Sequence, residues 1–243
     1  MATALACPPA QAQWSLGAGV ERFDWREDSS PIIVHEHGPR FLLTGGWTQP
    51  RTQGPLFAYR GELYAGSVTY DGSLLSDPAR AATGSSTYLG TTQAAQIRWR
   101  WPGTVDAVVG LEYEGWQRRL SSTQEETFRI LSLRLGAEHV AGAQRRFGAG
   151  GGVRVMLAAH EEATFVYSGV AYDVALEPGL GSSPYVHAGY RVAPHVTLLG
   201  YWDAMRLGRS NTVSLSRPPG PAVNVWQPAV DMWRLGLRVV YGW

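Results

Sequence analysis

The chain has 243 residues with 21 basic and 20 acidic side chains, which gives a net charge of +1. This balance excludes the strongly basic surface with which nucleic-acid-binding proteins neutralise phosphates, and no apolar run approaches the length of about 18 residues that a transmembrane helix needs. Charged residues make up only 17% of the chain, whereas glycine (29) and tryptophan (10) are abundant, a composition that favours a protein crossing lipid as strands.

The first twelve residues differ from the rest of the chain because they carry no charge and contain the one cysteine, Cys7. A short apolar run, a proline pair and an Ala-Gln-Ala triplet are typical of the end of a signal peptide. We therefore interpret residues 1–12 as the remainder of a signal peptide and residues 13–243 as one domain. Cleavage after Ala12 would leave a mature chain without cysteine, which suits an oxidising envelope compartment.

About ten segments then alternate between apolar and polar or small side chains. A period of two is typical of strands whose two faces meet different surroundings. In chain order these segments are 14–26, 40–49, 56–70, 87–101, 106–119, 127–140, 147–160, 183–192, 196–208 and 230–243. The alternation is less clean in 40–49 and 196–208. We predict an all-β chain of about ten strands, with eight or twelve strands as the alternatives.

The connections between these segments fall into two kinds that alternate along the chain. Short connections are 50–55, 102–105, 141–146 and 193–195, and longer ones are 27–39, 71–86, 161–182 and 209–229, with a modest one near 120–126. Up-and-down barrels have this pattern, because their periplasmic turns are tight and their extracellular loops are long. An even strand number then predicts that both termini are periplasmic. Residues 161–182 could also extend strands seven and eight beyond the membrane.

The last segment gives the clearest strand, because its apolar and its small or charged positions alternate over eleven residues. The two sets are Trp233, Leu235, Leu237, Val239, Tyr241 and Trp243 against Arg234, Gly236, Arg238, Val240 and Gly242. Ten steps of about 3.3 Å, tilted by about 40°, span roughly 25 Å, the height of the apolar band of an outer-membrane barrel. Lipid–water interfaces favour aromatic rings. We therefore predict a set of interface aromatics: Trp99, Trp101, Trp233, Tyr241 and Trp243.

Because lipid offers no hydrogen-bond partners, a sheet that crosses it must close on itself. Ten strands enclose a narrow lumen, which inward-facing arginine and glutamate side chains would fill. Such charges are tolerated when they are paired, so we predict a closed antiparallel up-and-down transmembrane β-barrel with ion pairs inside. The predicted lumen residues are Arg60, Glu62, Arg98, Arg100, Glu112, Glu114, Arg134, Glu138, Arg154, Arg234 and Arg238.

The signal-peptide remainder, the alternating strands and the terminal aromatic Trp243 together resemble the Gram-negative outer-membrane β-barrel proteins. The last strand resembles the signal that the outer-membrane assembly machinery reads. The resemblance implies an integral protein of the cell outer membrane, with the lipid bilayer, its lipopolysaccharide and the assembly machinery as partners. It does not imply an oligomeric state.

Ten strands also resemble the omptin proteases, and residues 188–195 followed by 196–208 are similar to the omptin penultimate hairpin. Omptins place an Asp pair and an Asp/His pair at the extracellular rim to activate water for peptide cleavage. This chain departs from that pattern: Asp71 and Asp77 are too far apart for the Asp pair, and no Asp-x-His accompanies His160. His160 and Asp71 remain the candidate catalytic residues at the rim.

His35-Glu36-His37 is a candidate metal pair, because two histidines at alternate positions of an extended segment point the same way and could share an ion with a third ligand elsewhere. Solvated loop polarity is the simpler interpretation, so we expect neither a metal nor another cofactor. The composition and the motifs predict a structural or surface-interaction role through long extracellular loops. The alternatives are an omptin-like or lipid-modifying hydrolase with a rim site near His160 and Asp71, and a small passive channel.

Overall fold

The computed structural model describes residues 13–29, 32–50, 54–74, 77–100, 105–139, 146–167, 169–217 and 220–243. The predicted signal-peptide remainder, residues 1–12, lies outside the described residues. The strands are β1 (Gln13–Ser29), β2 (Ile32–Thr48), β3 (Leu56–Leu74), β4 (Asp77–Arg100), β5 (Val105–Ser121), β6 (Gln124–His139), β7 (Phe147–Tyr167), β8 (Val170–Leu176), β9 (Ser182–Ala193), β10 (Val196–Leu207), β11 (Val213–Arg217), β12 (Gly220–Val225) and β13 (Ala229–Gly242). Among the described residues there is no helix long and apolar enough to cross a membrane.

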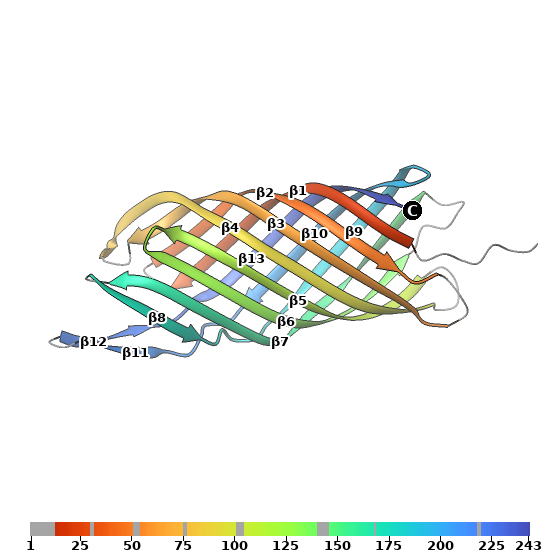
Figure 1. Cartoon of the computed structure of the whole chain (residues 1–243). Helices are drawn as coiled ribbons and strands as arrows, with labels where there is room; N and C mark the ends of the chain where they lie inside the picture. The colour runs from red at the N-terminus through yellow and green to blue at the C-terminus, as the bar shows by residue number, and fades with distance from the viewer. Residues whose placement is uncertain are drawn as a thin grey trace, which may run out of the picture.

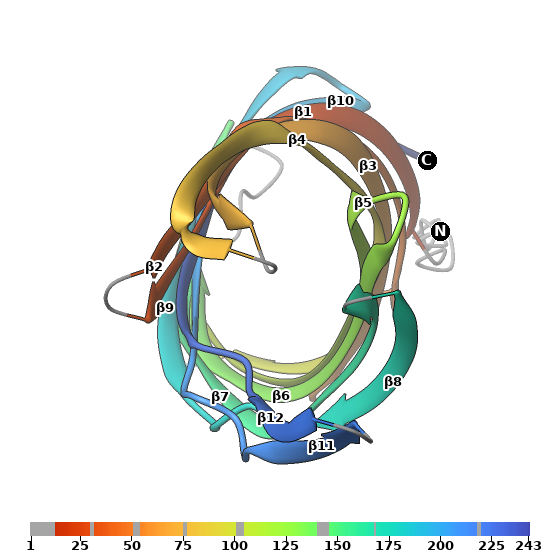
Figure 2. The ribbon, with the colours of Figure 1, turned by 90° about the vertical axis from the view of Figure 1, so that its left-hand side faces the viewer.

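Ten of these strands form a ring in the order β1-β2-β3-β4-β5-β6-β7-β9-β10-β13. The first and last strands pair antiparallel, from Ser15 opposite Gly242 to Asp28 opposite Ala229, and β6 pairs antiparallel with β7. Figure 1 shows that β1 starts and β13 ends at the same end of the barrel, here called the terminal end. Figure 2 looks along the axis from the other end, here called the hairpin end, where β8, β11 and β12 lie. The predicted closed barrel of ten strands is confirmed.

The outer wall carries a belt of exposed apolar side chains. On β13, Leu235 and Leu237 are 53% and 49% exposed, whereas Arg234 and Arg238, which flank this pair, are buried inside the barrel. Water hydrates such a belt unfavourably, whereas lipid tails accept it and the ring of strands satisfies the backbone hydrogen bonds. The wall therefore has the polarity of a barrel that spans a membrane.

The belt ends well before the hairpin end. The continuous run of exposed apolar side chains stops at Val20, Phe41, Tyr113, Leu131 and Leu157 on five of the strands, and on β7 the large apolar residue Val166 is exposed again nearer the hairpin end. Beyond them the outward positions turn polar, with Arg22, His37, Gln117, Arg129 and His160. The strands thus continue well beyond the apolar belt before they reach the hairpin end.

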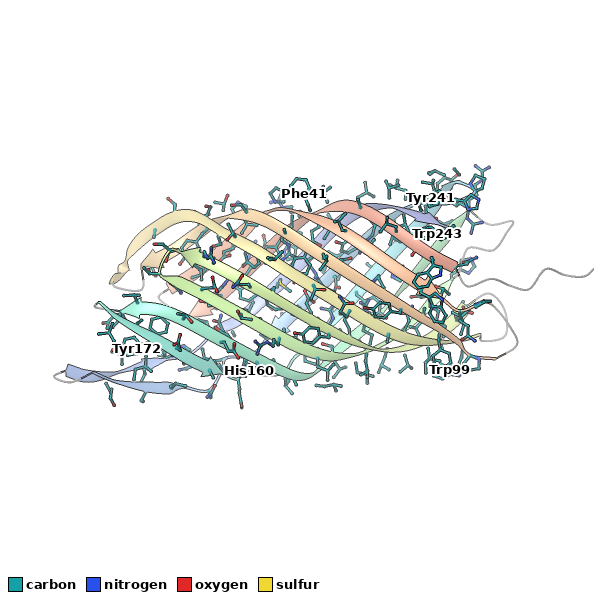
Figure 3. All side chains as sticks on the ribbon, viewed as in Figure 1. Phe41, Trp99, His160, Tyr172, Tyr241 and Trp243 are labelled. Carbon is teal, nitrogen blue, oxygen red and sulfur yellow. The ribbon has the colours of Figure 1, made fainter. Side chains whose placement is uncertain are left out.

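The aromatic rings predicted at the lipid interfaces lie at both borders of the belt. Trp99, Tyr241 and Trp243 are exposed at the terminal end (Figure 3). Trp233 is half-buried and stands opposite Asp24 on β1, at the border toward the hairpin end. Trp101 lies outside the described residues.

The predicted long connections are mostly strand, so the predicted strand bounds were too short. Residues 27–39 and 71–86 are mostly the paired ends of long strands, since β2 begins at Ile32 and β4 at Asp77. The connection near 120–126 is a turn at residues 122–123 between β5 and β6. Residues 161–182 contain the end of β7 and all of β8, and 209–229 contain the β11–β12 hairpin. The alternative of an extension at 161–182 is confirmed for β7.

The error has a physical cause. Beyond the lipid the outward side chains become polar, so the apolar–polar contrast that identifies a strand disappears. The ladder nevertheless continues, because the inward positions stay buried, as Phe23 and Trp25 on β1 do. A strand whose backbone N–H and C=O groups are hydrogen-bonded to both neighbouring strands stays in the sheet beyond the lipid, because leaving it would break those bonds.

Candidate functional site

The middle of the lumen is filled by a buried network of ion pairs. Arg154 Nη2 lies 2.8 Å from Glu112 Oε1 and 2.6 Å from Asp203 Oδ2. Arg234 Nη1 donates to Glu114 over 2.7 Å, and its Nη2 donates to Asp203 over 3.1 Å. Because each guanidinium meets more than one carboxylate, the network compensates much of the cost of removing these charges from water.

The predicted lumen residues whose side chains the structure describes all face the interior: Arg60, Glu62, Arg98, Glu112, Glu114, Arg134, Glu138, Arg154, Arg234 and Arg238. Arg134 pairs with Glu112, and Arg238 pairs with Glu62. The side chain of Arg100 lies outside the described set.

Sequence reasoning missed two members of this network, Arg40 and Asp203. Arg40 is buried against Glu21, and Asp203 joins Arg154 to Arg234. Both lie in segments with unclear alternation, 40–49 and 196–208. The signal that could have found Asp203 is the pairing of its strand with the last one. Asp203 stands opposite Arg234 in the β10–β13 ladder, and residues that stand opposite each other in a ladder point to the same face of the sheet.

An apolar layer lies next to this network on the side of the hairpin end. Trp116 and Phe128 stack with their ring centroids 4.8 Å apart, and Trp25 meets Phe128 edge-on at 5.5 Å. Further buried members of the layer are Phe23, Tyr88, Ile130, Met156, Met205, Val230 and Met232. The small cavity within the charged network holds about 30 Å³, room for about one water molecule. Network and layer together fill the middle of the lumen.

Arg118 lies beyond the apolar layer and is surrounded by carboxylates from three other strands. It donates to Glu27 over 2.9 Å, to Glu36 over 3.2 Å and to Glu126 over 2.8 Å. Its guanidinium also lies 4.6 Å from the ring centroid of Trp25, a favourable cation–π distance. None of these residues belonged to the predicted lumen cluster.

A fourth carboxylate, Glu161, stands beside this group without a compensating cation of its own. It lies on β7 beyond Leu157, where the continuous run of exposed apolar side chains on that strand stops. Burial, together with the nearby Glu126 carboxylate, raises the pKa of Glu161 to about 9. Its Oε2 has no hydrogen-bond partner among the described residues. At that pKa the Glu161 carboxyl is neutral at pH 7, and its unpartnered oxygen can hydrogen-bond to a ligand, whereas a nearby cation would favour the ionised form.

A pocket of about 410 Å³ opens above the Arg118 group at the hairpin end. Its floor consists of Glu27, Arg118, Glu126 and Glu161, and its walls include Phe165, Tyr172 and Leu176 from β7 and β8 and Leu215, Val225 and Trp226 from the β11–β12 region. Figure 2 shows these hairpins along one side of the barrel mouth. Apolar walls around a few convergent polar groups are typical of small-molecule sites.

A second cavity, of about 360 Å³, lies at the terminal end of the lumen. Its lining includes Arg60, Arg98, Arg146 and Arg191 but a single glutamate, Glu138. Arg98 Nη1 lies 2.9 Å from a Glu138 oxygen. This vestibule carries an excess of positive charge, in contrast to the pocket.

The two rim candidates, His160 and Asp71, do not come together. His160 faces outward on β7 (Figure 3), with Nε2 3.5 Å from Glu162 Oε1. Asp71 lies on β3 opposite His35, and β4, β5 and β6 separate β3 from β7 in the ring. The geometry gives these two residues no shared catalytic site.

No family model and no curated protein matches the chain. Among solved structures, the chain is similar to the outer membrane protease OmpT from Escherichia coli, with a TM-score of 0.57 and 11% identity over 99% of both chains. The translocator domain of the autotransporter NalP from Neisseria meningitidis gives a TM-score of 0.45 at 10% identity, over 94% of this chain and 88% of that one. Neisserial surface protein A gives 0.38 at 11% identity, over 94% and 96%. The chain therefore has the closed barrel fold of the outer-membrane β-barrel proteins.

Proposed function

We propose that this chain is an integral outer-membrane protein with a surface-interaction role, whose sealed barrel presents the hairpin-end pocket to the outside. The pocket binds a small molecule that combines an apolar body with a positively charged group. The observation that carries the proposal is the pocket floor, where the Arg118 guanidinium lies among three glutamates, Glu27, Glu126 and Glu161, beneath aromatic walls.

The chemistry of the pocket favours an organic cation over a neutral or anionic ligand. The aromatic walls remove water from the apolar body, and rings attract a cation through their faces. An ammonium group near Glu161 would lower the pKa of that carboxyl and form a charge-assisted hydrogen bond with it. An anion would meet the carboxylates of Glu27 and Glu126 at the floor and would be repelled.

Binding of three matched probes tests this ligand class. The probes 4-phenylbutylamine, 4-phenylbutanol and 4-phenylbutanoate differ only in their charged end, and calorimetry with the protein in lipid nanodiscs measures their affinities. We expect the amine to bind tightest and the acid weakest, and we expect Glu161→Gln to reduce the preference for the amine. Glu162→Gln is the matched control, because Glu162 is the next residue and faces outward. Equal or tighter binding of the acid would contradict the proposal.

The orientation has its own test. We propose that both termini are periplasmic and that the hairpins face the cell exterior. The substitution Ser214→Cys on β11, made in a chain lacking Cys7, introduces a thiol that should react with a membrane-impermeant maleimide on intact cells. Protection of that thiol in intact cells, with labelling only after the outer membrane is permeabilised, would reverse the orientation.

The filled lumen favours a binding role over the passive-channel alternative. The charged network and the apolar layer lie between the pocket and the vestibule, and the cavity inside the network holds about 30 Å³. In planar bilayers the purified protein should show no discrete conductance steps. Regular single-channel steps from the wild-type protein would instead support a channel.

A further inference from the structure

A second cluster lies on the outer wall beyond the lipid belt, where β2 and β3 bring three metal-ligating side chains together. His35 and His37 alternate along β2 and therefore point to the same face. Asp71 on β3 stands directly opposite His35 in the ladder. Each of the three offers one ligand atom, and these atoms lie within 4.8 Å of one another. The sequence motif supplied the two histidines, and the pairing of strands across a segment expected to be a loop supplied the third group.

The surroundings of the cluster suit a metal ion. The imidazole rings of His35 and His37 stack with centroids 4.6 Å apart, so two like-charged imidazolium rings would repel each other there. Nδ1 of His37 is buried and has no hydrogen-bond partner in the part of the chain that the structure describes. A buried ring nitrogen without a partner is costly, and a bound cation would satisfy it.

A carboxylate behind the cluster holds one of the histidines in place. Asp24 on β1 is buried, and its Oδ2 lies 3.0 Å from Nε2 of His35. Arg26 donates to the other oxygen of Asp24 over 3.0 Å. Metal-ligating histidines usually donate their second ring N–H to a carboxylate, which fixes the ring and raises its basicity. Asp24 can serve in this way or add an oxygen ligand.

We propose that His35, His37 and Asp71 bind a divalent transition-metal ion, with Zn²⁺ as the fitting species. Two imidazole nitrogens and one carboxylate oxygen are ligands of zinc and leave a fourth position for water. Zinc bonds of about 2.0–2.2 Å hold tetrahedral ligand atoms about 3.3–3.6 Å apart. To bind the ion, the three ligand atoms would have to come closer to one another by about an ångström. Rotation of the side chains can supply this movement while the strands stay in place.

The position of the site gives the ion a structural effect as well. β2 and β3 pair at 35–37 with 69–71 and again at 41–48 with 58–65, and Pro39 lies between the two stretches. Proline has no N–H to donate to the ladder. Among the described residues, the ends of β2 and β3 nearest the hairpin end of the barrel are therefore paired only through the short stretch 35–37 with 69–71. An ion bound by both strands would hold these two strand ends together.

Zinc titration of the tag-free protein in nanodiscs tests the proposal. We expect one ion per chain, and a tetrahedral absorption spectrum when Co²⁺ replaces Zn²⁺. His35→Ala, His37→Ala and Asp71→Asn should each weaken binding by about tenfold or more. His160→Ala is the control, because His160 also faces outward at the hairpin end but stands on β7 beside Glu162.

Three results would overturn the site: no zinc binding by the wild-type protein, an equal loss in His160→Ala, or full affinity in Asp71→Asn. The gel shift of a folded barrel on boiling shows whether each variant folds. Should an alanine variant fail to fold, His37→Gln replaces it and keeps the size of the side chain. The wild-type Co²⁺ spectrum tests the ligand geometry without any substitution.

Discussion

The two ends of the lumen carry opposite charge, although the same barrel strands build both. At the hairpin end, Arg118 faces Glu27, Glu36, Glu126 and Glu161. At the terminal end, six arginines line a vestibule that contains one glutamate, and two of them, Arg134 and Arg238, also belong to the charged network. Between them the charges balance, with five carboxylates and five guanidiniums: Glu21, Glu62, Glu112, Glu114 and Asp203 with Arg40, Arg134, Arg154, Arg234 and Arg238.

The difference shows how a closed barrel separates two environments. Each inward position is set by parity along its own strand, so charge can change along the axis without changing the fold. Only a layer that is both filled and neutral keeps the two ends apart. The balanced network, with the apolar layer against it, is that barrier, and its removal should produce the largest effects.

Arg154→Met breaks the barrier at its most buried cation. The substitution removes the guanidinium that Glu112 and Asp203 share, and loss of one partner of a buried ion pair costs about 3–5 kcal/mol. The urea midpoint of unfolding in detergent micelles should fall accordingly. Arg60→Met is the control, since Arg60 is more exposed and its nearest contact with Glu112 is 3.7 Å. Equal midpoints for Arg154→Met and wild type would show that the network is no structural barrier.

Gly236→Ala tests how tightly the side chains above the vestibule are packed. A Cβ at Gly236 would lie 2.3 Å from the ring of Tyr201, whose hydroxyl donates to Glu21. Overpacking of this kind typically costs about 1–3 kcal/mol, measured by the same unfolding midpoint. Gly200→Ala on β10 should change little, because the nearest atoms to its Cβ lie 4.0 Å away. A harmless Gly236→Ala would show that Tyr201 moves freely in the lumen.

Glu161→Gln sharpens the comparison through its pH dependence. The folded-state pKa of about 9 lies above the ordinary value of 4.5, so the unfolded chain loses the proton first as pH rises. Glu161 therefore costs no stability below about pH 4.5, and the cost grows until pH 9. The glutamine variant should gain several kcal/mol over wild type at pH 8, because the cost grows by about 1.4 kcal/mol per pH unit above pH 4.5, and nothing at pH 4.

Glu162→Gln is the matched control for this pH effect. Its carboxylate accepts a hydrogen bond from Arg129, which lowers its pKa, so its loss should bring no gain at pH 8. A gain of the same size in both variants would trace the effect to the net charge of the protein and away from burial at position 161.

The barrel could be predicted from the sequence because every second residue of a strand that crosses lipid faces the lipid and must be apolar. Leu235 and Arg234 alternate in opposite environments, and this pattern led to the strand number, the closure and the ion pairs. It could not predict the ends of the strands, because above the lipid the outward residue is a histidine or an arginine and the contrast is lost. His35 and Asp71 were therefore assigned to separate loops although they are neighbours in one ladder.

The pocket could not be predicted from the sequence for a related reason. Arg118, Glu27, Glu36, Glu126 and Glu161 come from five strands, and only the register between those strands brings them together. Parity alone places each of them inward once the strands are known to continue. Their shared height in the barrel depends on the stagger of every hairpin, which no single segment of the sequence reveals.

Glu138→Gln gives the smallest effect and completes the comparison, because it removes the carboxylate of the vestibule. Arg98 would lose its 2.9 Å partner and remain among Arg60, Arg146 and Arg191. We expect a loss of about 1 kcal/mol, since the pair is partly hydrated, and a smaller loss at 0.5 M salt, which screens the repulsion between the arginines. The signs are what matter: loss of a glutamate stabilises the hairpin end and destabilises the terminal end. If Glu138→Gln raised the unfolding midpoint as Glu161→Gln is expected to do, the vestibule would not be short of negative charge, and the opposition between the two ends would be wrong.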